Sequence, residues 1–280
     1  MHFAAPLGPP PAARLRRREL FDIAQDNQIR SLLASEPLAN AHGFKTMKNE
    51  QPRPLVDWRT IDTILLDMDG TLLDRHFDDY FWEQYVPEHY SLLHDLSIEG
   101  ARRHLLDQYK AREGTLAWTD LDYWSNTLGL DIPSLKSQMH HLIAVHPHVI
   151  DFLTFCREQG KLLCLVTNAH SKTLDIKMRK TGLSRHFDHI VCAEQVGLAK
   201  EDPIFWQRLE AILGYEKERT LLADDTEKVL LAAKTYGMGV LIHVARPSSR
   251  KPVAGSERFL SIEHFRELIP ETWAEKSETG

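Results

Sequence analysis

The amino-acid sequence predicts an α/β fold built on a doubly wound parallel sheet. Its 280 residues, 42% of them hydrophobic, are enough to bury a sheet core and a smaller second unit. Short apolar runs that end in polar residues are typical of strands buried on both faces. Segments with helical spacing separate these runs, and right-handed crossovers through such helices give a parallel sheet.

Five apolar runs are predicted to form the strands, in the order in which the chain supplies them. They are Thr63–Asp67, Leu162–Thr167, Ile190–Ala193, Thr220–Ala223 and Gly239–His243. Four segments are expected to be the helices that connect the strands, because their apolar residues recur with the helical period. These segments are Val149–Gln159, Ser171–Thr181, Pro203–Leu213 and Glu227–Tyr236.

The chain between the first two strands carries only helical patterns, which predicts a separate helical unit inserted into the core. Four helices are expected there, separated by glycines and a proline: Asp78–Leu93, Ser97–Arg112, Leu116–Leu128 and Ser134–Ile143. The predicted organisation is therefore a core from 55–75 and 148–270 with an insert at 76–147. The proline-rich and arginine-rich residues 1–54 are expected to be a disordered extension, and residues 271–280 a terminal tail.

The end of the first strand holds the most informative residues. Asp67 and Asp69 follow the apolar run, and side chains two apart along a strand can project to the same side. Gly70 then allows a sharp turn and a close approach to a ligand. Ligands bind at the carboxyl ends of strands in open α/β sheets, so we expect two acids in a binding site.

Three further strand ends or loops supply polar residues in the same way. Thr167 and Asn168 end the second strand and can donate hydrogen bonds to an oxyanion. Lys200 lies just before a helix whose start is marked by Asp202 as N-cap and a proline at the first helical position. The paired carboxylates Asp224 and Asp225 end the fourth strand.

Composition excludes several classes of partner. The net charge of −6 and the pI near 6.2 argue against a general nucleic-acid-binding surface. No apolar run approaches the length of a membrane-spanning helix. Cys156, Cys164 and Cys192 lack metal-ligand spacing and are expected to be reduced, buried thiols. These observations predict a cytoplasmic protein that binds neither nucleic acid nor membrane.

The order of these strand-end motifs resembles the haloacid dehalogenase (HAD) superfamily. The resemblance rests on Asp67-Met68-Asp69-Gly70-Thr71, Thr167-Asn168, Lys200 and Asp224-Asp225. It implies a Rossmannoid core with a helical cap of the C1 type, and a Mg²⁺-dependent phosphatase. Asp67 would then be the nucleophile that forms an aspartyl-phosphate, and Asp69 the general acid and base.

The same resemblance implies a phosphate and metal site. Thr167, the backbone near Asn168 and Lys200 would hold the phosphoryl oxygens. Mg²⁺ would be bound by Asp67, the backbone carbonyl of Asp69 and Asp225, with Asp224 as the second choice. The sequence departs from a common family pattern at Val229, where many members carry another acid, and at Glu201, where a proline is commoner.

Further motifs in the cap and core resemble the bacterial GMP/IMP 5′-nucleotidase subfamily, over roughly residues 56–270. They are Asp79-Tyr80-Phe81-Trp82, Leu121-Asp122-Tyr123-Trp124, Leu128-Gly129-Leu130-Asp131, Thr167-Asn168-Ala169-His170 and Lys200-Glu201-Asp202. The resemblance implies a purine nucleoside monophosphate as the small phosphorylated substrate. Cap aromatic residues could stack on a base, although helical spacing favours a place in the cap core. His170 is a candidate at the rim of the substrate site.

Other functions stay open at this point. A phosphomutase would use the same aspartates, and a general phosphatase for sugar phosphates or phosphoglycolate would need no purine-binding cap. A non-catalytic binding protein is disfavoured by the intact set Asp67, Asp69, Lys200 and Asp225. The sequence does not determine the preferred phosphate ester, the oligomeric state, the role of residues 1–46 or the cap residues that contact substrate.

Overall fold

The computed structural model describes residues 55–273, and within them the predicted α/β class is confirmed. A six-stranded parallel sheet has the order β3-β2-β1-β4-β5-β6. The first strand lies at its centre, since Leu65 is in register with Cys164 on one side and Leu222 on the other. The strands are β1 Thr63–Leu66, β2 Leu162–Thr167, β3 His189–Cys192, β4 Thr220–Asp224, β5 Val240–Val244 and β6 Leu260–Ile262.

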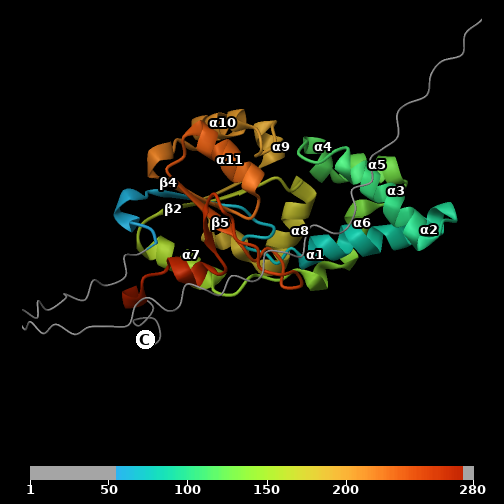
Figure 1. Cartoon of the computed structure of the whole chain (residues 1–280), viewed down its shortest axis with the longest axis horizontal. Helices are drawn as coiled ribbons and strands as arrows, with labels where there is room; N and C mark the ends of the chain where they lie inside the picture. Colours follow the sequence, from blue (N-terminus) through green and yellow to red (C-terminus); the bar gives the residue numbers. More distant parts are fainter. Residues whose placement is uncertain (1–54, 274–280) are drawn as a thin grey trace, which may run out of the picture. The chain divides into compact units, whose positions relative to one another are not determined.

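Helices cover both faces of the sheet, as in a doubly wound fold (Figure 1). Apolar side chains of α7 and α8 pack on one face in a cluster with Ile64 and Leu66. Those of α10 and α11 pack on the other face with Leu65 and Leu222. The helices of the core are α7 Val149–Glu158, α8 Ser171–Thr181, the short α9 Ala193–Val196, α10 Pro203–Leu213 and α11 Glu227–Tyr236.

The predicted core elements are found to within about a residue at most boundaries, with two differences. Ala193, expected in the third strand, begins α9, because the side chain of Gln195 accepts a hydrogen bond from the Cys192 N–H at that point. The strand β6 was not predicted, since its three residues are too few to show a clear alternation. The expected helix start at Pro203 is present, and Asp202 caps it by accepting from the Ile204 N–H at 2.9 Å.

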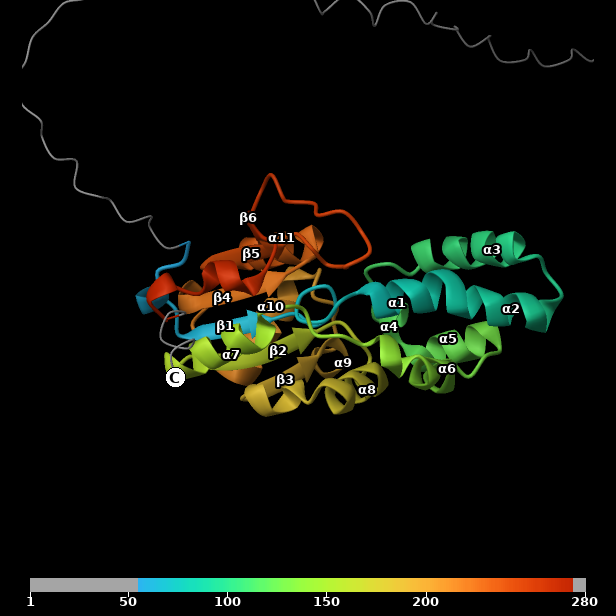
Figure 2. The same cartoon turned by 90° about the horizontal axis from the view of Figure 1, so that it is seen from below.

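Residues between β1 and α7 form a second group of helices with a core of their own. Figure 2 shows α1 to α6 grouped on the side of the molecule toward which the strand ends point. Buried aromatic and aliphatic residues hold the group together, among them Phe81, Leu105 and Trp124. The helices are α1 His76–Tyr80, a π-helical turn Phe81–Tyr85, α2 Val86–His94, α3 Ile98–Lys110, α4 Leu116–Thr119, α5 Leu121–Leu128 and α6 Ile132–Gln138.

Three of the four helices predicted for this cap differ from those observed. The predicted helix Ser134–Ile143 starts earlier, at Ile132, and ends at Gln138, after which His140–Leu142 form a separate 3₁₀ turn. The predicted helix Asp78–Leu93 is continuous but contains a π-helical turn, a form associated with functional regions. The predicted helix Leu116–Leu128 is wrong as a single helix. Asp120 has an extended backbone, and its carboxylate accepts from the N–H groups of Asp122 and Tyr123, so it ends α4 and caps α5.

Three remaining expectations can be set against the described residues. Cys156, Cys164 and Cys192 are buried and form no disulfide. Within residues 55–273, no helix combines the length and apolar character needed to cross a membrane. The extension expected at 1–54 lies outside the described residues. Of the tail expected at 271–280, residues 274–280 also lie outside them, whereas Trp273 packs against the core and its indole N–H donates to Glu158 at 2.7 Å.

Candidate active site

The centre of the site is the carboxyl end of β1, where the sheet places Asp67. The Asp67 N–H donates to the Ala223 carbonyl at 3.0 Å, which continues the pairing of β1 with β4 by one residue. Its side chain is only 8% exposed, and burial raises the pKa of Asp67 to about 6, although Lys200 opposes the shift. Asp67 is thus a buried carboxylate that depends on neighbouring cations to stay ionised.

Gly70 allows the chain to pass close to Asp225, one of the two acids at the end of β4. Its φ of +88° lies in the left-handed region, where residues with a Cβ are strained. A Cβ atom at this position would also collide with the carboxylate of Asp225 and touch the Pro247 side chain at 3.0 Å. The glycine of the first motif is therefore required both by the turn and by this close approach.

Lys200 joins the ends of the three strands β1, β2 and β4. Its side chain is 2% exposed, and its Nζ donates to the Asp67 carboxylate, to Asp224 Oδ2 at 2.7 Å and to the Val166 carbonyl at 3.2 Å. Burial lowers the pKa of this ammonium, but the two carboxylates outweigh burial and leave the pKa raised. Lys200 is consequently a fixed positive charge beside Asp67.

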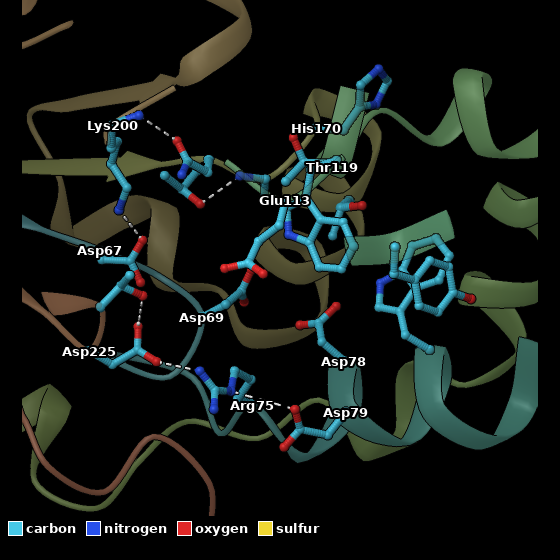
Figure 3. A pocket seen from close by; sticks show the side chains of 18 of the residues that line it. Asp67, Asp69, Arg75, Asp78, Asp79, Glu113, Thr119, His170, Lys200 and Asp225 are labelled. Carbon is cyan, nitrogen blue, oxygen red and sulfur yellow. Dashed lines mark hydrogen bonds and ion pairs between the residues drawn. The ribbon is translucent and has the colours of Figure 1, made fainter. Parts of the chain in front are cut away.

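The two acids at the end of β4 are used differently. Asp224 has both oxygens engaged, one by Lys200 and the other by the Thr226 N–H at 2.9 Å. Asp225 Oδ2 accepts from Arg75 Nη1 at 2.7 Å, whereas its Oδ1 meets the Thr226 hydroxyl at 3.4 Å. Figure 3 shows Arg75 between Asp225 and Asp79. Arg75 was not predicted as a site residue, because an arginine after the first motif carries no signal of its own.

Asp67, Asp224 and Asp225 form a group that suits a hard metal ion. One carboxylate oxygen from each lies within 4.8 Å of the others. Burial and the other two acids raise the pKa of Asp225 well above its ordinary value. Three carboxylates face the two cations Lys200 and Arg75, so the ionised group has negative charge left over. Oxygen ligands with uncompensated charge are the environment that Mg²⁺ favours in proteins.

Asp69 lies outside this group and has partners that were not predicted. Its Oδ1 accepts from Lys177 Nζ at 2.5 Å, and the same nitrogen donates to Asp78 Oδ2 at 2.5 Å. Asp78 Oδ1 in turn accepts from Lys136 Nζ at 2.7 Å. Burial raises the pKa of Asp69 to about 6, with Lys177 opposing. No sequence pattern singles out Lys177 or Lys136: Lys177 lies on a helix with several other charged residues, and Lys136 is a single lysine on a short helix.

The second motif contributes one hydroxyl and one amide, with different surroundings. Thr167 is 1% exposed, and its hydroxyl oxygen accepts from the Ala169 N–H at 3.0 Å. The side chain of Asn168 donates to Glu201 Oε2 at 2.8 Å and accepts from the Lys200 N–H at 2.9 Å. The side chain of Asn168 therefore fastens the loop that carries Lys200, and contact of its backbone with a phosphoryl group stays a prediction.

His170 lies at the boundary between core and cap. Its Nδ1 accepts from the Lys172 N–H at 3.3 Å and so caps α8. Its Nε2 lies 3.7 Å from Asp120 Oδ1 and 4.0 Å from Glu194 Oε2. His170 is thus a rim residue by position, and its contact with substrate stays a prediction.

A cavity of about 510 Å³ joins these groups to the cap. Figure 3 shows Asp67, Asp225 and Lys200 on one side and Asp78, Thr119 and His170 on the other. Three aromatic residues of the cap, Trp82, Tyr109 and Trp118, line the cavity. Phe77, Phe81 and Trp124 are no more than 1% exposed and belong to buried clusters. The cavity thus has a charged end in the core and a partly aromatic end in the cap.

Comparison with known proteins defines the family. The model of the haloacid dehalogenase-like hydrolases matches residues 61–237, and the chain belongs to this family. The prediction of a hydrolytic enzyme of the HAD type is thereby confirmed. The match includes all four strand-end motifs described above.

Among relatives, the GMP/IMP nucleotidase YrfG of Escherichia coli (strain K12) is 38% identical over 215 residues, covering 77% of this chain and 97% of its own. The predicted resemblance to that group is confirmed. Phosphoglycolate phosphatase 1 of Pseudomonas aeruginosa is 27% identical over 131 residues, 47% of this chain and 48% of its own.

Two solved structures share the fold. A HAD phosphatase from Thermococcus onnurineus superposes with a TM-score of 0.63 at 25% identity, covering 74% of this chain and 96% of its own. The L-2-haloacid dehalogenase of Xanthobacter autotrophicus has a TM-score of 0.51 at 15% identity, covering 74% and 96%. The latter likeness concerns the fold alone.

Proposed function

We propose that the protein is a Mg²⁺-dependent phosphomonoesterase that works through an aspartyl-phosphate on Asp67. The observation that carries this proposal is the pairing of a buried Asp67 with Lys200, next to Asp224 and Asp225. A phosphate dianion repels a carboxylate nucleophile, so the nucleophile must be surrounded by positive charge. Lys200 supplies part of this positive charge, and the excess negative charge of the three carboxylates would attract a cation that supplies the rest.

The residues present fit the metal. Mg²⁺ would be held by Asp67, by Asp225 and by the backbone carbonyl of Asp69, and when bound it would offset the charge of the phosphoryl group. Asp225 remains the better candidate of the pair. Both oxygens of Asp224 accept short hydrogen bonds from Lys200 and Thr226, whereas Oδ1 of Asp225 has only a 3.4 Å contact with the Thr226 hydroxyl. The Lys200 ammonium would lie beside the phosphoryl oxygens together with Thr167 and the Asn168 backbone.

The proposed reaction has two steps. In the first, an Asp67 oxygen forms a bond to phosphorus while the bond to the ester oxygen breaks, and Asp69 gives that oxygen its proton. In the second, Asp69 takes a proton from a water molecule whose oxygen attacks phosphorus, which releases phosphate and restores Asp67. A pKa near 6 suits Asp69 for both roles, because the proton can be gained and lost near neutral pH.

We further propose that the substrate is a purine 5′-monophosphate, with GMP and IMP preferred. The support is the 38% identity to the GMP/IMP nucleotidase across nearly its whole length, together with the cavity that extends from Asp67 to Trp82 and Trp118. An aromatic face can stack on a purine. A cytoplasmic location stays a prediction.

A screen of phosphate release in the presence of Mg²⁺ tests this proposal. GMP and IMP are expected to exceed AMP, CMP and UMP in kcat/KM by about ten- to a hundredfold, the size expected when the wrong base leaves a polar group unpaired. The Asp67→Asn variant serves as the control for contaminating phosphatases.

Other outcomes of the screen would replace the proposal. Similar kcat/KM values for nucleotides, sugar phosphates and phosphoglycolate would indicate a general phosphatase. Conversion of one sugar phosphate isomer into another without net phosphate release would indicate a phosphomutase. Binding of nucleotides without any turnover would indicate a non-catalytic protein.

A further inference from the structure

Lys177 is a buried lysine that lies between the first motif and the cap. It belongs to α8 of the core, its side chain is 1% exposed, and its Nζ lies 2.5 Å from Asp69 Oδ1 and 2.5 Å from Asp78 Oδ2. Asp78 belongs to α1, the first helix of the cap. The lysine therefore binds Asp69 and a cap residue with the same ammonium group.

The cap holds the other end of this arrangement through Lys136. Its Nζ donates to Asp78 Oδ1 at 2.7 Å and lies 5.2 Å from the ring centroids of Phe77 and Phe81. Both oxygens of Asp78 are thus engaged by lysines from different helices, α6 of the cap and α8 of the core. Asp78 has little freedom to move, and so the Lys177 ammonium is held in place.

A buried lysine is costly to fold, which calls for a reason beyond packing. Replacing buried ion pairs with apolar residues of similar volume is often neutral or even stabilising. Here the ammonium engages Oδ1 of Asp69, while Oδ2 accepts no hydrogen bond from a side chain within residues 55–273. Asp69 is 23% exposed and lines the cavity, so one of its oxygens is fixed and the other is available.

We propose that Lys177 is a positioning residue for Asp69, which it holds by Oδ1 so that Oδ2 is presented to the ester oxygen, and that Asp78 holds Lys177 from the cap. The inference rests on the proposed phosphatase reaction, in which Asp69 transfers the proton. Lys177 itself touches neither the phosphoryl group nor the metal ligands Asp67 and Asp225.

The leaving group separates this role from a structural one. A nucleoside 5′-oxygen must be protonated as it leaves, whereas a thiolate leaves readily as an anion. GMP and its analogue with sulfur in place of the bridging 5′-oxygen would fill the same cavity and differ in their need for Asp69. A loss of Asp69 positioning should therefore slow GMP cleavage and largely spare the sulfur analogue.

The experiment measures the first turnover of both esters by rapid mixing. Lys177→Met is expected to slow GMP cleavage by about 10²- to 10⁴-fold, the usual contribution of a general acid, and cleavage of the sulfur analogue by less than about tenfold. Lys172→Met is the matched control, since Lys172 also joins α8 to the cap, through Asp122 at 2.5 Å, but its side chain is 48% exposed. It should leave both rates within about twofold of the parent, as expected for a surface ion pair.

Two conservative variants keep the inference testable if Lys177→Met does not fold. Lys177→Arg should slow GMP less than the methionine variant, and Asp78→Asn should slow it by about tenfold or more, with the sulfur analogue affected less in each case. Equal losses for the two esters in these variants would overturn the positioning role. A parent protein that cleaves neither ester would instead overturn the proposed function, and this inference with it.

Discussion

Two groups of charged side chains meet at the cavity, and they differ in their balance of charge. The strand-end group has three carboxylates and two cations, Asp67, Asp224, Asp225, Lys200 and Arg75. The cap-linking group has two of each, Asp69, Asp78, Lys177 and Lys136. Ionised, the first group retains negative charge and the second is neutral.

The difference separates a site for a ligand from a site that holds the protein together. A neutral network with short hydrogen bonds is complete without any ion, and removal of one member leaves a buried charge without a partner. A group with excess negative charge is destabilised by its own repulsion until a cation binds. Mg²⁺ binding is therefore expected to stabilise the strand-end group, whereas mutation of the cap-linking group is expected to destabilise the protein.

The largest effect is expected from the proposed nucleophile in the strand-end group. Asp67→Asn should lower phosphate release by about 10⁴-fold or more, because an amide cannot form the acyl-phosphate, and losses of this order follow removal of a nucleophile. Turnover is measured with GMP and Mg²⁺, and circular dichroism checks that the variant is folded. A folded variant that works at close to the parent rate would exclude Asp67 as the nucleophile.

Metal dependence is the next test of the same group. EDTA should abolish turnover and Mg²⁺ should restore it, because the three carboxylates need a cation before a phosphate dianion can approach. Asp225→Ala should raise the Mg²⁺ concentration for half-maximal activity more than Asp224→Ala does. The reason is that Lys200 and Thr226 hold the two oxygens of Asp224 at 2.7 and 2.9 Å, whereas Oδ1 of Asp225 has only a 3.4 Å contact with the Thr226 hydroxyl. The opposite order in the titrations would reverse the assignment of these two acids.

Mutation of the cap-linking group should instead lower the stability of the protein. Lys136→Met removes one partner of Asp78 and should lower the free energy of unfolding by about 3–5 kcal/mol, the usual result of breaking a buried ion pair. Urea unfolding without metal measures the change. Lys228→Met is a suitable control, since its pair with Glu113 is exposed and should contribute less than about 1 kcal/mol. Equal stabilities for the two variants would contradict the proposed importance of the buried group.

The two groups also differ in how far the sequence could predict them. Asp67, Asp224 and the Thr167 hydroxyl lie at or next to strand ends, and the carboxyl ends of parallel strands meet at one edge of the sheet. Local patterns were therefore enough to bring the strand-end group together. Arg75 is the exception, since its pairing with Asp225 depends on how the chain leaves the Gly70 turn.

The cap-linking group could not be predicted in this way, because its members are joined only by tertiary packing. Asp69 and Lys177 are 108 residues apart, and Lys177 and Asp78 are 99 apart. A lysine on a helix is normally solvated, so nothing in the sequence marks Lys136 or Lys177 as a buried residue. Nor does the sequence give the packing of α6 against α8 that buries them.

The smallest predicted effect is a gain in stability from a substitution in the strand-end group. Asp225→Asn should raise the free energy of unfolding of the metal-free protein by about 1–2 kcal/mol, within the range of single stabilising changes. The side chain is 3% exposed, and the acids Asp224 and Asp67 disfavour its ionised form. An asparagine oxygen can still accept from Arg75, so the substitution removes repulsion and keeps the hydrogen bond.

The same variant should lose the gain in stability that Mg²⁺ gives the parent. A ligand that binds only the folded state stabilises it by mass action, and a weakened site forfeits that term. Urea unfolding of parent and variant, each with EDTA and with Mg²⁺, gives the four values required. Asp62→Asn, which disrupts an exposed pair with Arg219, controls for the removal of a carboxylate elsewhere. A loss of stability of the metal-free protein in Asp225→Asn would mean that other charges of the protein already compensate the strand-end group. The contrast in charge between this group and the cap-linking group would then be wrong.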